Sequence, residues 1–266
     1  MAHLTGRTAL VTGGTRGIGL AISRRLAEDG ARVALVGRGA DSVKTATEEL
    51  HAAGHDVLGI VADVTADADI ARTVGEVVAW TGGLDILVNN AGIAEEAAFA
   101  DITRESWERV LTVNLTAPFL LTQRAATVMR PGSSVVNISS IDAHGADGPY
   151  ASYIAAKAGL VGLTKSAAVE LAPAGIRVNS VSPGWVHTDM AAEAVGPQML
   201  AYMQNSFARV PMRRLITTEE VAHAVGYLAG PAASGITGVD LLVDGGTLAN
   251  LYILETLPDT GGEAQS

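Results

Sequence analysis

The sequence predicts a single α/β domain: a Rossmann-type, doubly wound parallel β-sheet with helices on both faces. Short apolar runs alternate along the chain with stretches in which apolar residues recur at helical spacing. The apolar runs are continuous rather than alternating, which is typical of strands buried on both faces of a parallel sheet. The length of 266 residues suits one large domain. No linker or repeat divides residues 1–246.

Taken in order, the expected strands and helices are joined by short connections. Apolar residues recurring at Ile18, Ile22 and Leu26 predict a first helix that ends at Gly30. The run of two threonines and two glutamates at 217–220 predicts a capping box. The expected strands are 8–11, 33–36, 57–61, 86–88, 135–138, 177–181 and 241–243; the later helices are 41–51, 67–80, two within 103–129, one from Tyr153 to about 171, and 217–228. Only residues 188–214 and the tail 247–266 depart from this alternation of strands and helices.

Composition and charge exclude several classes of function. The formal net charge of −10 argues against a nucleic-acid partner. The chain has no cysteine, which excludes disulfides, zinc–thiolate sites and thiol catalysis, and no metal site is predicted. No apolar run is long enough to span a bilayer, and residues 1–7 lack the apolar core of a signal peptide. We therefore expect a cytoplasmic protein without a membrane partner.

A glycine-rich turn lies between the first strand and the first helix. Its glycines, at positions 13, 17 and 19, allow a tight turn and close approach of the backbone to a pyrophosphate. The helix N-terminus that follows attracts negative charge. A glycine-rich turn can also be merely structural, but this location favours dinucleotide binding.

The end of the second strand indicates which dinucleotide is bound. NAD-binding sites usually carry an acid there to hold the ribose 2′-hydroxyl. This chain has Gly37 and Arg38 instead, and Arg38 and Arg16 are both suited to a 2′-phosphate. The alternative is that both arginines are ordinary solvated side chains. The sequence therefore predicts NADP(H).

Tyr153 and Lys157 are four residues apart, on one face of an expected helix. A lysine ammonium there is expected to lower the tyrosine pKa from about 10 towards neutrality, as a general acid–base requires. Ser140 follows an apolar strand, at the sheet edge where α/β proteins bind ligands. Taken alone, the tyrosine–lysine spacing also fits an ordinary amphipathic helix.

With these residues in view, the chain closely resembles the classical short-chain dehydrogenase/reductase family from about Thr5 to Gly246. Seven motifs match in order: 12–19, Asp63–Val64, 89–92, Asn114, Ser140 with Tyr153 and Lys157, 183–188 and 243–246. The resemblance implies a catalytic tetrad of Asn114, Ser140, Tyr153 and Lys157. Together, the residues described above and the resemblance predict that NADP(H) is bound by Gly13, Thr15, Arg16, Gly17, Ile18, Gly19, Arg38, Asp63, Val64, Asn90, Ala91, Gly92, Tyr153, Lys157, Pro183, Gly184, Val186 and Thr188.

The resemblance also implies a mechanism and an assembly. Ser140 and Tyr153 would bind the substrate oxygen, and Tyr153 would transfer the proton while hydride passes to or from the nicotinamide. Lys157 would lower the tyrosine pKa and bind the nicotinamide ribose, and Asn114 would hold a water that relays protons. We expect NADPH-dependent reduction of a ketone to a secondary alcohol, or the reverse, on a small, largely apolar, cyclic or polyketide-type molecule. The family's assembly implies a homotetramer.

The family's mobile lid corresponds to about 188–214. Its apolar side chains are expected either to line a pocket or to pack the lid onto the body: Met190, Val195, Met199, Leu200, Tyr202, Met203 and Phe207. His144 and His187 either face the substrate or are solvated. In the extension, apolar residues 248–254 are expected to pack on the same subunit or a neighbour, and 259–266 have a disordered tail's composition.

Two other functions stay open. One is a 3-oxoacyl-(acyl carrier protein) reductase, whose carrier docks on arginines near the site entrance; of these the chain keeps only Arg130. The strongly negative net charge also disfavours an acidic carrier. The other is a catalytically idle NADP-binding regulator, against which the complete tetrad argues.

Overall fold

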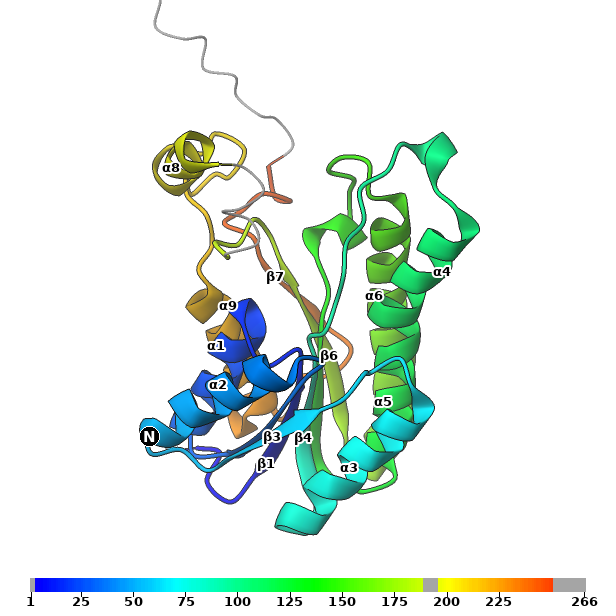
Figure 1. Ribbon diagram of the computed structural model, residues 1–266, viewed down its shortest axis with the longest axis vertical. Helices are drawn as coiled ribbons and strands as arrows, with labels where there is room; N and C mark the ends of the chain where they lie inside the picture. The colour runs from blue at the N-terminus through cyan, green and yellow to red at the C-terminus, as the bar shows by residue number, and fades with distance from the viewer. Residues whose placement is uncertain (1–2, 189–195, 251–266) are drawn as a thin grey trace, which may run out of the picture.

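The computed structural model describes residues 3–188 and 196–250 and contains one seven-stranded parallel sheet (Figure 1). The strand order is β3-β2-β1-β4-β5-β6-β7, which confirms the doubly wound Rossmann-type arrangement. The strands are β1 Thr8–Thr12, β2 Arg32–Gly37, β3 Val57–Val61, β4 Leu84–Asn89, β5 Met129–Ile138, β6 Arg177–Pro183 and β7 Asp240–Val243. The order reverses between β1 and β4, and such a switch point opens a crevice at the carboxyl ends of the strands.

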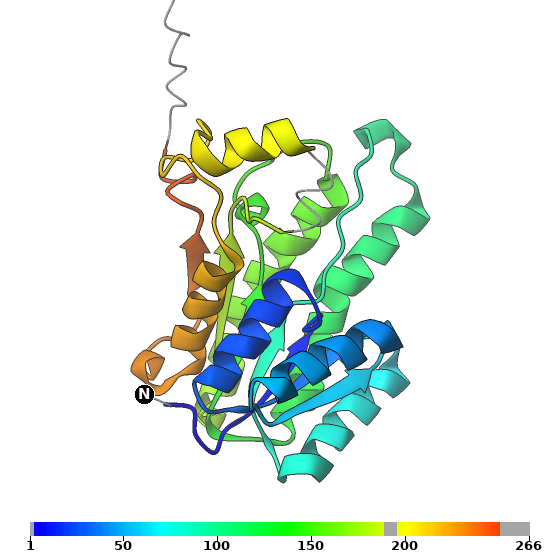
Figure 2. The same cartoon turned by 60° about the vertical axis from the view of Figure 1, so that its left-hand side comes forward.

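Helices cover both faces of the sheet, as the continuous apolar strands require (Figures 1 and 2). α1 (Gly17–Glu28), α2 (Ala40–Ala52) and α9 (Thr218–Ala229) bury one core against the sheet. α3 (Asp67–Thr81), α5 (Ala117–Ala126) and α6 (Ala151–Leu171) bury a second core on the other face. α4 (Arg104–Leu111) packs beside α6. Within the described ranges, no helix is long and apolar enough to cross a bilayer.

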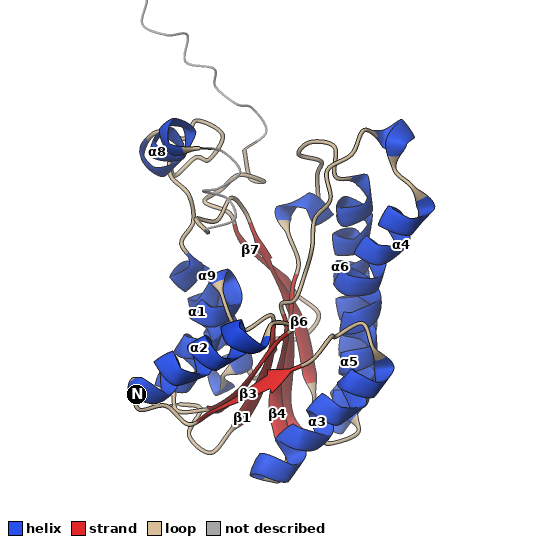
Figure 3. Ribbon diagram, viewed as in Figure 1, coloured by secondary structure: helices blue, strands red, loops and turns tan. Residues whose placement is uncertain are grey.

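Short helical turns complete the fold (Figure 3). They are η1 Phe99–Asp101, η3 Ile141–Ala143, η4 Ala172–Ala174 and η5 Pro231–Ala233. A π-helical turn, η2 (Thr112–Thr116), joins α4 to α5, so the predicted pair of helices in 103–129 is one nearly continuous helical segment. The capping box at Thr217 is confirmed: its side chain accepts from the Glu220 N–H, and the Glu220 carboxylate accepts from the Thr217 N–H.

The start of β5 is the main correction to the predicted elements. The strand begins at Met129, not at 135, and the preceding helix ends at Ala126. The pairing with β4 shifts between Leu84↔Met129 and Ile86↔Ser134, so the intervening residues form an irregularity around Gly132, whose φ is +90°. The Pro131–Gly132 pair is typical of a turn, so the sequence does not indicate that Met129, just before it, pairs with Leu84 of β4.

Described residues of the segment after β6 form a small core of their own. α8 (Pro197–Asn205) lies beyond the carboxyl end of β7 (Figure 1). Met203 and Phe207 are buried in a small core with Val210 and Leu215, and Trp185 packs against this core. Met199 and Tyr202 are exposed, so among the described residues the apolar lid side chains divide between packing and surface. Met190, Val195 and the extension from residue 251 lie outside the described residues.

Candidate active site

The glycine turn is shaped for close backbone approach. Gly13 and Gly17 have φ of +62° and +51°, conformations that favour glycine. A Cβ on Gly19 would lie 2.0 Å from the carbonyl oxygen of Gly13, so no side chain fits there. α1 begins beyond Arg16 without a side-chain cap, which leaves its first N–H groups directed at the turn. These residues fit a dinucleotide pyrophosphate.

Asn90 and Thr12 tie this turn to the end of β4. The Asn90 side-chain amide donates to the carbonyls of Thr12 and Gly13 at 2.9 and 3.1 Å. The Thr12 hydroxyl accepts from the N–H groups of Asn90 and Ala91. Behind them, the Asn89 amide donates to the Asn137 side chain at 2.8 Å and steadies the central strands. Asn90 and Ala91 therefore lie against the predicted cofactor turn.

The predicted adenosine end of the cofactor site lies beyond β2. Arg16 and Arg38 are exposed, and neither forms an ion pair within the described part of the chain. Backbone and side-chain hydrogen bonds from Thr65 lower the pKa of Asp63, and the positive charge of Arg38 acts in the same direction. Val64 is partly buried against the second core. An ionised Asp63 is suited to accept a hydrogen bond from an adenine amino group.

The predicted nicotinamide end lies between β6 and the glycine turn. A Cβ on Gly184 would lie 2.9 Å from Asp244 Cα, so the Pro183–Gly184 backbone is tightly packed. Val186 forms an isolated bridge with Ile216. Thr188 reaches the glycine turn: a Cβ on Gly17 would lie 3.9 Å from its methyl group. A cavity of about 260 Å³ opens here between α1, Thr188 and the start of α9.

Asn114 is fully buried in the π-helical turn. Its side-chain amide donates to the carbonyls of Ile93 and Val110 at 2.8 and 2.9 Å, and its oxygen accepts from the Ile93 N–H at 3.3 Å. A Cβ on Gly92 would lie 2.7 Å from this oxygen and 3.6 Å from Lys157 Nζ. Asn114 therefore fixes the loop after β4. Because Gly92 has no side chain, this loop can approach Lys157.

Two serines end β5, and their contacts separate their roles. Ser139 Oγ donates to the Lys157 carbonyl at 3.1 Å and so braces α6. Ser140 caps η3: its Oγ accepts from the Asp142 N–H at 3.1 Å and donates to Asp142 Oδ2 at 3.3 Å. Ser140 is also close enough to the Tyr153 phenol for its side chain to lower the pKa of that group. Ser139 therefore supports α6, whereas Ser140 lies close to Tyr153.

Tyr153 and Lys157 lie on one face of α6, with Nζ 5.4 Å from the ring centroid. The expected lowering of the Tyr153 pKa is wrong for the protein without cofactor. Burial raises this pKa to about 12; the Ser140 hydrogen bond opposes the rise, and the charge of Asp142 adds to it. Lys157 donates to the Ile138 carbonyl at 2.8 Å, and burial lowers its own pKa to about 8. Burial is therefore the largest influence on both pKa values.

His144 and His187 are both exposed, and each also contacts a polar side chain. His144 Nε2 lies 2.6 Å from Asp240 Oδ2 of β7, and this carboxylate also accepts from Ser180 and Ser182. The contact holds the loop after Ser140 against β7. His187 Nε2 lies 3.2 Å from the Gln204 side-chain amide of α8.

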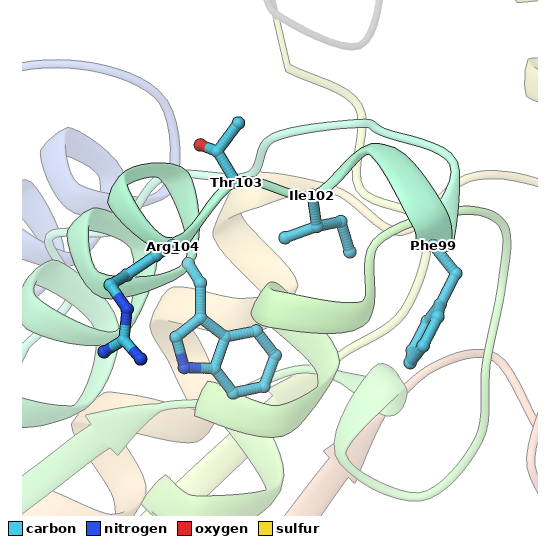
Figure 4. A pocket seen from close by; sticks show the side chains of 5 residues that line it. Phe99, Ile102, Thr103 and Arg104 are labelled. Atoms are coloured by element: carbon cyan, nitrogen blue, oxygen red, sulfur yellow. The ribbon is translucent and has the colours of Figure 1, made fainter.

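A second hollow, of about 340 Å³, lies on the outer flank of η1 and α4 (Figure 4). It is lined by Phe99, Ile102, Thr103, Arg104 and Trp107 and contains none of the predicted site residues. Figure 4 shows Phe99 and Arg104 on either side of Ile102, and Phe99 is 84% exposed. This hollow is an apolar surface feature separate from the tetrad.

Fold and site together define a nucleotide-binding oxidoreductase of the Rossmann type. Residues 13–247 match the family described as enoyl-(acyl carrier protein) reductase. A short-chain type dehydrogenase/reductase from Mycobacterium marinum has a similar structure, with a TM-score of 0.87 and 34% identity, covering 94% of this chain and 98% of that one. The chain belongs to the short-chain dehydrogenase/reductase family and is an oxidoreductase acting on CH–OH/C=O groups.

Relatives of known activity differ in substrate. The chain is 43% identical over 248 residues to cis-4-hydroxycyclohexanecarboxylate dehydrogenase of Sinomonas cyclohexanicum, covering 91% of this chain and 97% of the relative. It is 38% identical over 246 residues to the 3-oxoacyl-[acyl-carrier-protein] reductase of Aquifex aeolicus, covering 91% and 98%. The family therefore settles the reaction class and leaves the substrate to the site itself.

Proposed function

We propose that the protein uses NADPH to reduce a ketone on a small, largely apolar molecule, or catalyses the reverse oxidation. The observation that carries this proposal is the convergence of Ser140, Tyr153 and Lys157 at the carboxyl end of β5, beside Asn114 and Gly92. A ring ketone is the first substrate to test, because one relative is named for a hydroxycyclohexanecarboxylate. When bound, the nicotinamide supplies or accepts the hydride.

The chain's own groups would bind the substrate oxygen and move the proton. Ser140 Oγ and the Tyr153 phenol both donate to the carbonyl oxygen, and the phenol gives up its proton as the alcohol forms. With a pKa near 12 the free phenol is protonated at neutral pH, as a proton donor must be. Lys157 lies beside the ring, where its ammonium stabilises the phenolate that remains. Asn114 holds the loop that brings Gly92 against this lysine.

Replacing the proton donor tests this role. Tyr153→Phe keeps the ring and removes the hydroxyl, so turnover is expected to fall by about 10²- to 10⁴-fold, the range for loss of a general acid. NADPH binding, measured by fluorescence titration, should change little, because the glycine turn is intact. Residual turnover within about tenfold of the unmutated protein would assign the proton to another group.

NADP(H) rather than NAD(H) is our proposed cofactor. Arg16 and Arg38 are exposed at the end of the site where the sequence offers no acid to hold a ribose 2′-hydroxyl. Two guanidinium groups are suited to bind a 2′-phosphate.

A carrier-linked 3-oxoacyl substrate is the second candidate, favoured by the relatives that reduce it. Arg130, the retained carrier-docking arginine, hydrogen-bonds to the buried Asp85 at 3.3 Å, at the amino-terminal end of the sheet. The proposed tetrad lies at the opposite, carboxyl end of the strands, which favours the free ketone. Comparing kcat/KM for a 3-oxoacyl carrier protein and for cyclohexanone would decide between them.

We also propose a homotetramer. The exposed side of α6 carries Ala155, Ala158 and Gly162 at helical spacing, and Val169 follows beyond the exposed Lys165 and Ser166. Phe99, Trp107 and Phe119 on neighbouring elements are exposed as well. Such a surface is suited to pack against a copy of itself across a two-fold axis.

A further inference from the structure

Asp142 is a half-buried carboxylate at the reacting centre that the proposed mechanism does not use. Its Oδ2 accepts from Ser140 Oγ at 3.3 Å, and its Oδ1 accepts no hydrogen bond from the described residues. Its negative charge raises the pKa of both Tyr150 and Tyr153, so it lies within electrostatic reach of the catalytic phenol. Because Ser140 would bind the substrate oxygen at about 2.8 Å, Asp142 Oδ2 would lie within about 6 Å of that oxygen.

The other carboxylates around this site already have partners. Glu95 forms a two-pronged ion pair with Arg109. Glu96 accepts from the Tyr150 hydroxyl at 2.9 Å. Asp147 pairs with Arg209 at 3.0 Å. Asp240 is likewise held by His144, Ser180 and Ser182.

Asp142, by contrast, has no cationic partner anywhere in 3–188 and 196–250. The nearby basic side chains are engaged elsewhere: Lys157 with the Ile138 carbonyl, His144 with Asp240 and Arg209 with Asp147. The stretches 1–2, 189–195 and 251–266 contain no lysine, arginine or histidine in their sequence. The chain's own side chains therefore leave this carboxylate without a counter-ion.

An uncompensated carboxylate in this position has two costs. Burial disfavours its charged form, which raises its own pKa. It also holds the Ser140 hydroxyl proton, which the proposed reaction needs at the substrate oxygen. A bound molecule that brings a positive charge or a hydrogen-bond donor to Asp142 would relieve both costs.

We infer that Asp142 is a specificity residue that selects ketones carrying an ammonium or hydroxyl group within about 6 Å of the carbonyl oxygen, and that disfavours ketones carrying a carboxylate there. The donor binds Asp142, and the Ser140 hydroxyl is released to the substrate oxygen. The apolar remainder of the substrate contacts the rest of the site. This inference rests on the proposed ketone reduction and adds the polar group that the substrate must carry.

Four ring ketones of similar size test the inference: 4-aminocyclohexanone, 4-hydroxycyclohexanone, cyclohexanone and 4-oxocyclohexanecarboxylate. With NADPH, kcat/KM for the ammonium ketone is expected to exceed that for the carboxylate ketone by about 10- to 100-fold, as for a charge-assisted hydrogen bond. Asp142→Asn should reduce this ratio to within about threefold. Asp147→Asn removes the same charge from a carboxylate of the same loop that is paired with Arg209, and it should leave the preference in place.

Binding to the complex with NADP⁺, measured by calorimetry, separates this inference from the proposed reaction. A ketone cannot be reduced in that complex, so selectivity is read without turnover. Charge-selective binding that Asp142→Asn abolishes, without turnover of any ketone, would support the inference and overturn the proposed reaction. Turnover with equal kcat/KM across the four ketones would support the proposed reaction and overturn the inference. If Asp142→Asn does not fold, Asp142→Ser replaces it. If the unmutated protein shows no charge preference among the ketones, that result is sufficient to overturn the inference.

Discussion

Burial governs the protonation of Lys157 and Tyr153 before any ligand binds. The same desolvation acts in opposite directions on the two groups, because one is charged when protonated and the other when deprotonated. The Lys157 pKa falls to about 8, and the Tyr153 pKa rises to about 12. Each shift links proton binding to folding, so the site contributes to the pH dependence of stability.

Lys157→Met should reveal this linkage in the cofactor-free protein. The folded pKa of about 8 lies below the ordinary value of 10.5, so the unfolded chain binds more protons between these values. The unmutated protein should therefore gain stability relative to Lys157→Met as pH rises from 8 towards 10.5. Between pH 8 and 9.5 the difference in unfolding free energy between the two proteins should change by about 1.5 kcal/mol. Urea denaturation at several pH values measures this difference. If the stabilities of the two proteins change in parallel with pH, the lowered pKa of Lys157 is refuted.

Arg38 provides the test of cofactor choice. Arg38→Asp replaces a donor for a 2′-phosphate with an acid suited to a ribose hydroxyl. The ratio of NADH to NADPH dissociation constants should fall by about 10- to 100-fold. Lys44→Asp makes the same charge change at an exposed residue of α2 and should leave the ratio unaltered. Equal affinity for both cofactors in the unmutated protein would count against NADP(H).

At the scale of elements, the cofactor turn depends on three chain segments that meet. Thr12 ends β1, Asn90 follows β4, and Gly19 belongs to the first turn of α1. Their hydrogen bonds set the turn in position before any cofactor binds, which reduces the ordering cost of binding.

Gly19→Ala should therefore weaken NADPH binding by more than tenfold, because its Cβ would lie 2.0 Å from the Gly13 carbonyl oxygen and displace the turn. Gly75→Ala is the matched control. Gly75 lies within α3 with no atom within 4 Å of the added Cβ, so this change should stabilise the protein by about 0.5–1 kcal/mol. Fluorescence titration and thermal unfolding measure the two effects. Unchanged cofactor affinity in Gly19→Ala would mean that the turn adapts.

The sequence pattern predicted the elements better than it predicted their side-chain chemistry. Apolar runs and the glycine turn located six of the seven strands closely. They missed the early start of β5, because Pro131–Gly132 resembles a loop. The pKa of Tyr153 could not be predicted from a four-residue spacing, because burial depends on the packed surroundings. Asp142 lies two residues after Ser140, but no sequence pattern predicts that a loop carboxylate is half-buried without a cationic partner.

At the scale of the whole molecule, the two faces of the helix layer differ. The buried side of α6 packs on the sheet and carries Lys157 and Thr164. Its opposite side exposes small residues, and Val169 is 76% exposed. A helix with a single buried face does not need such an apolar exposed side. The same helix therefore carries the predicted active site on one side and the proposed subunit contact on the other.

Gly162→Glu tests the proposed contact without disturbing the subunit. Gly162 is exposed on α6, and no atom lies within 4 Å of an added Cβ, so the variant should fold and its helix should gain propensity. In a tetramer packed through this face, the new carboxylate would be buried without a partner, which is strongly unfavourable. Light scattering at micromolar concentration should then show a tetramer for the unmutated protein and a smaller species for Gly162→Glu. Lys44→Glu, on the opposite face of the sheet, should stay tetrameric. A monomeric unmutated protein would refute the assembly, and a tetrameric Gly162→Glu would place its contacts elsewhere.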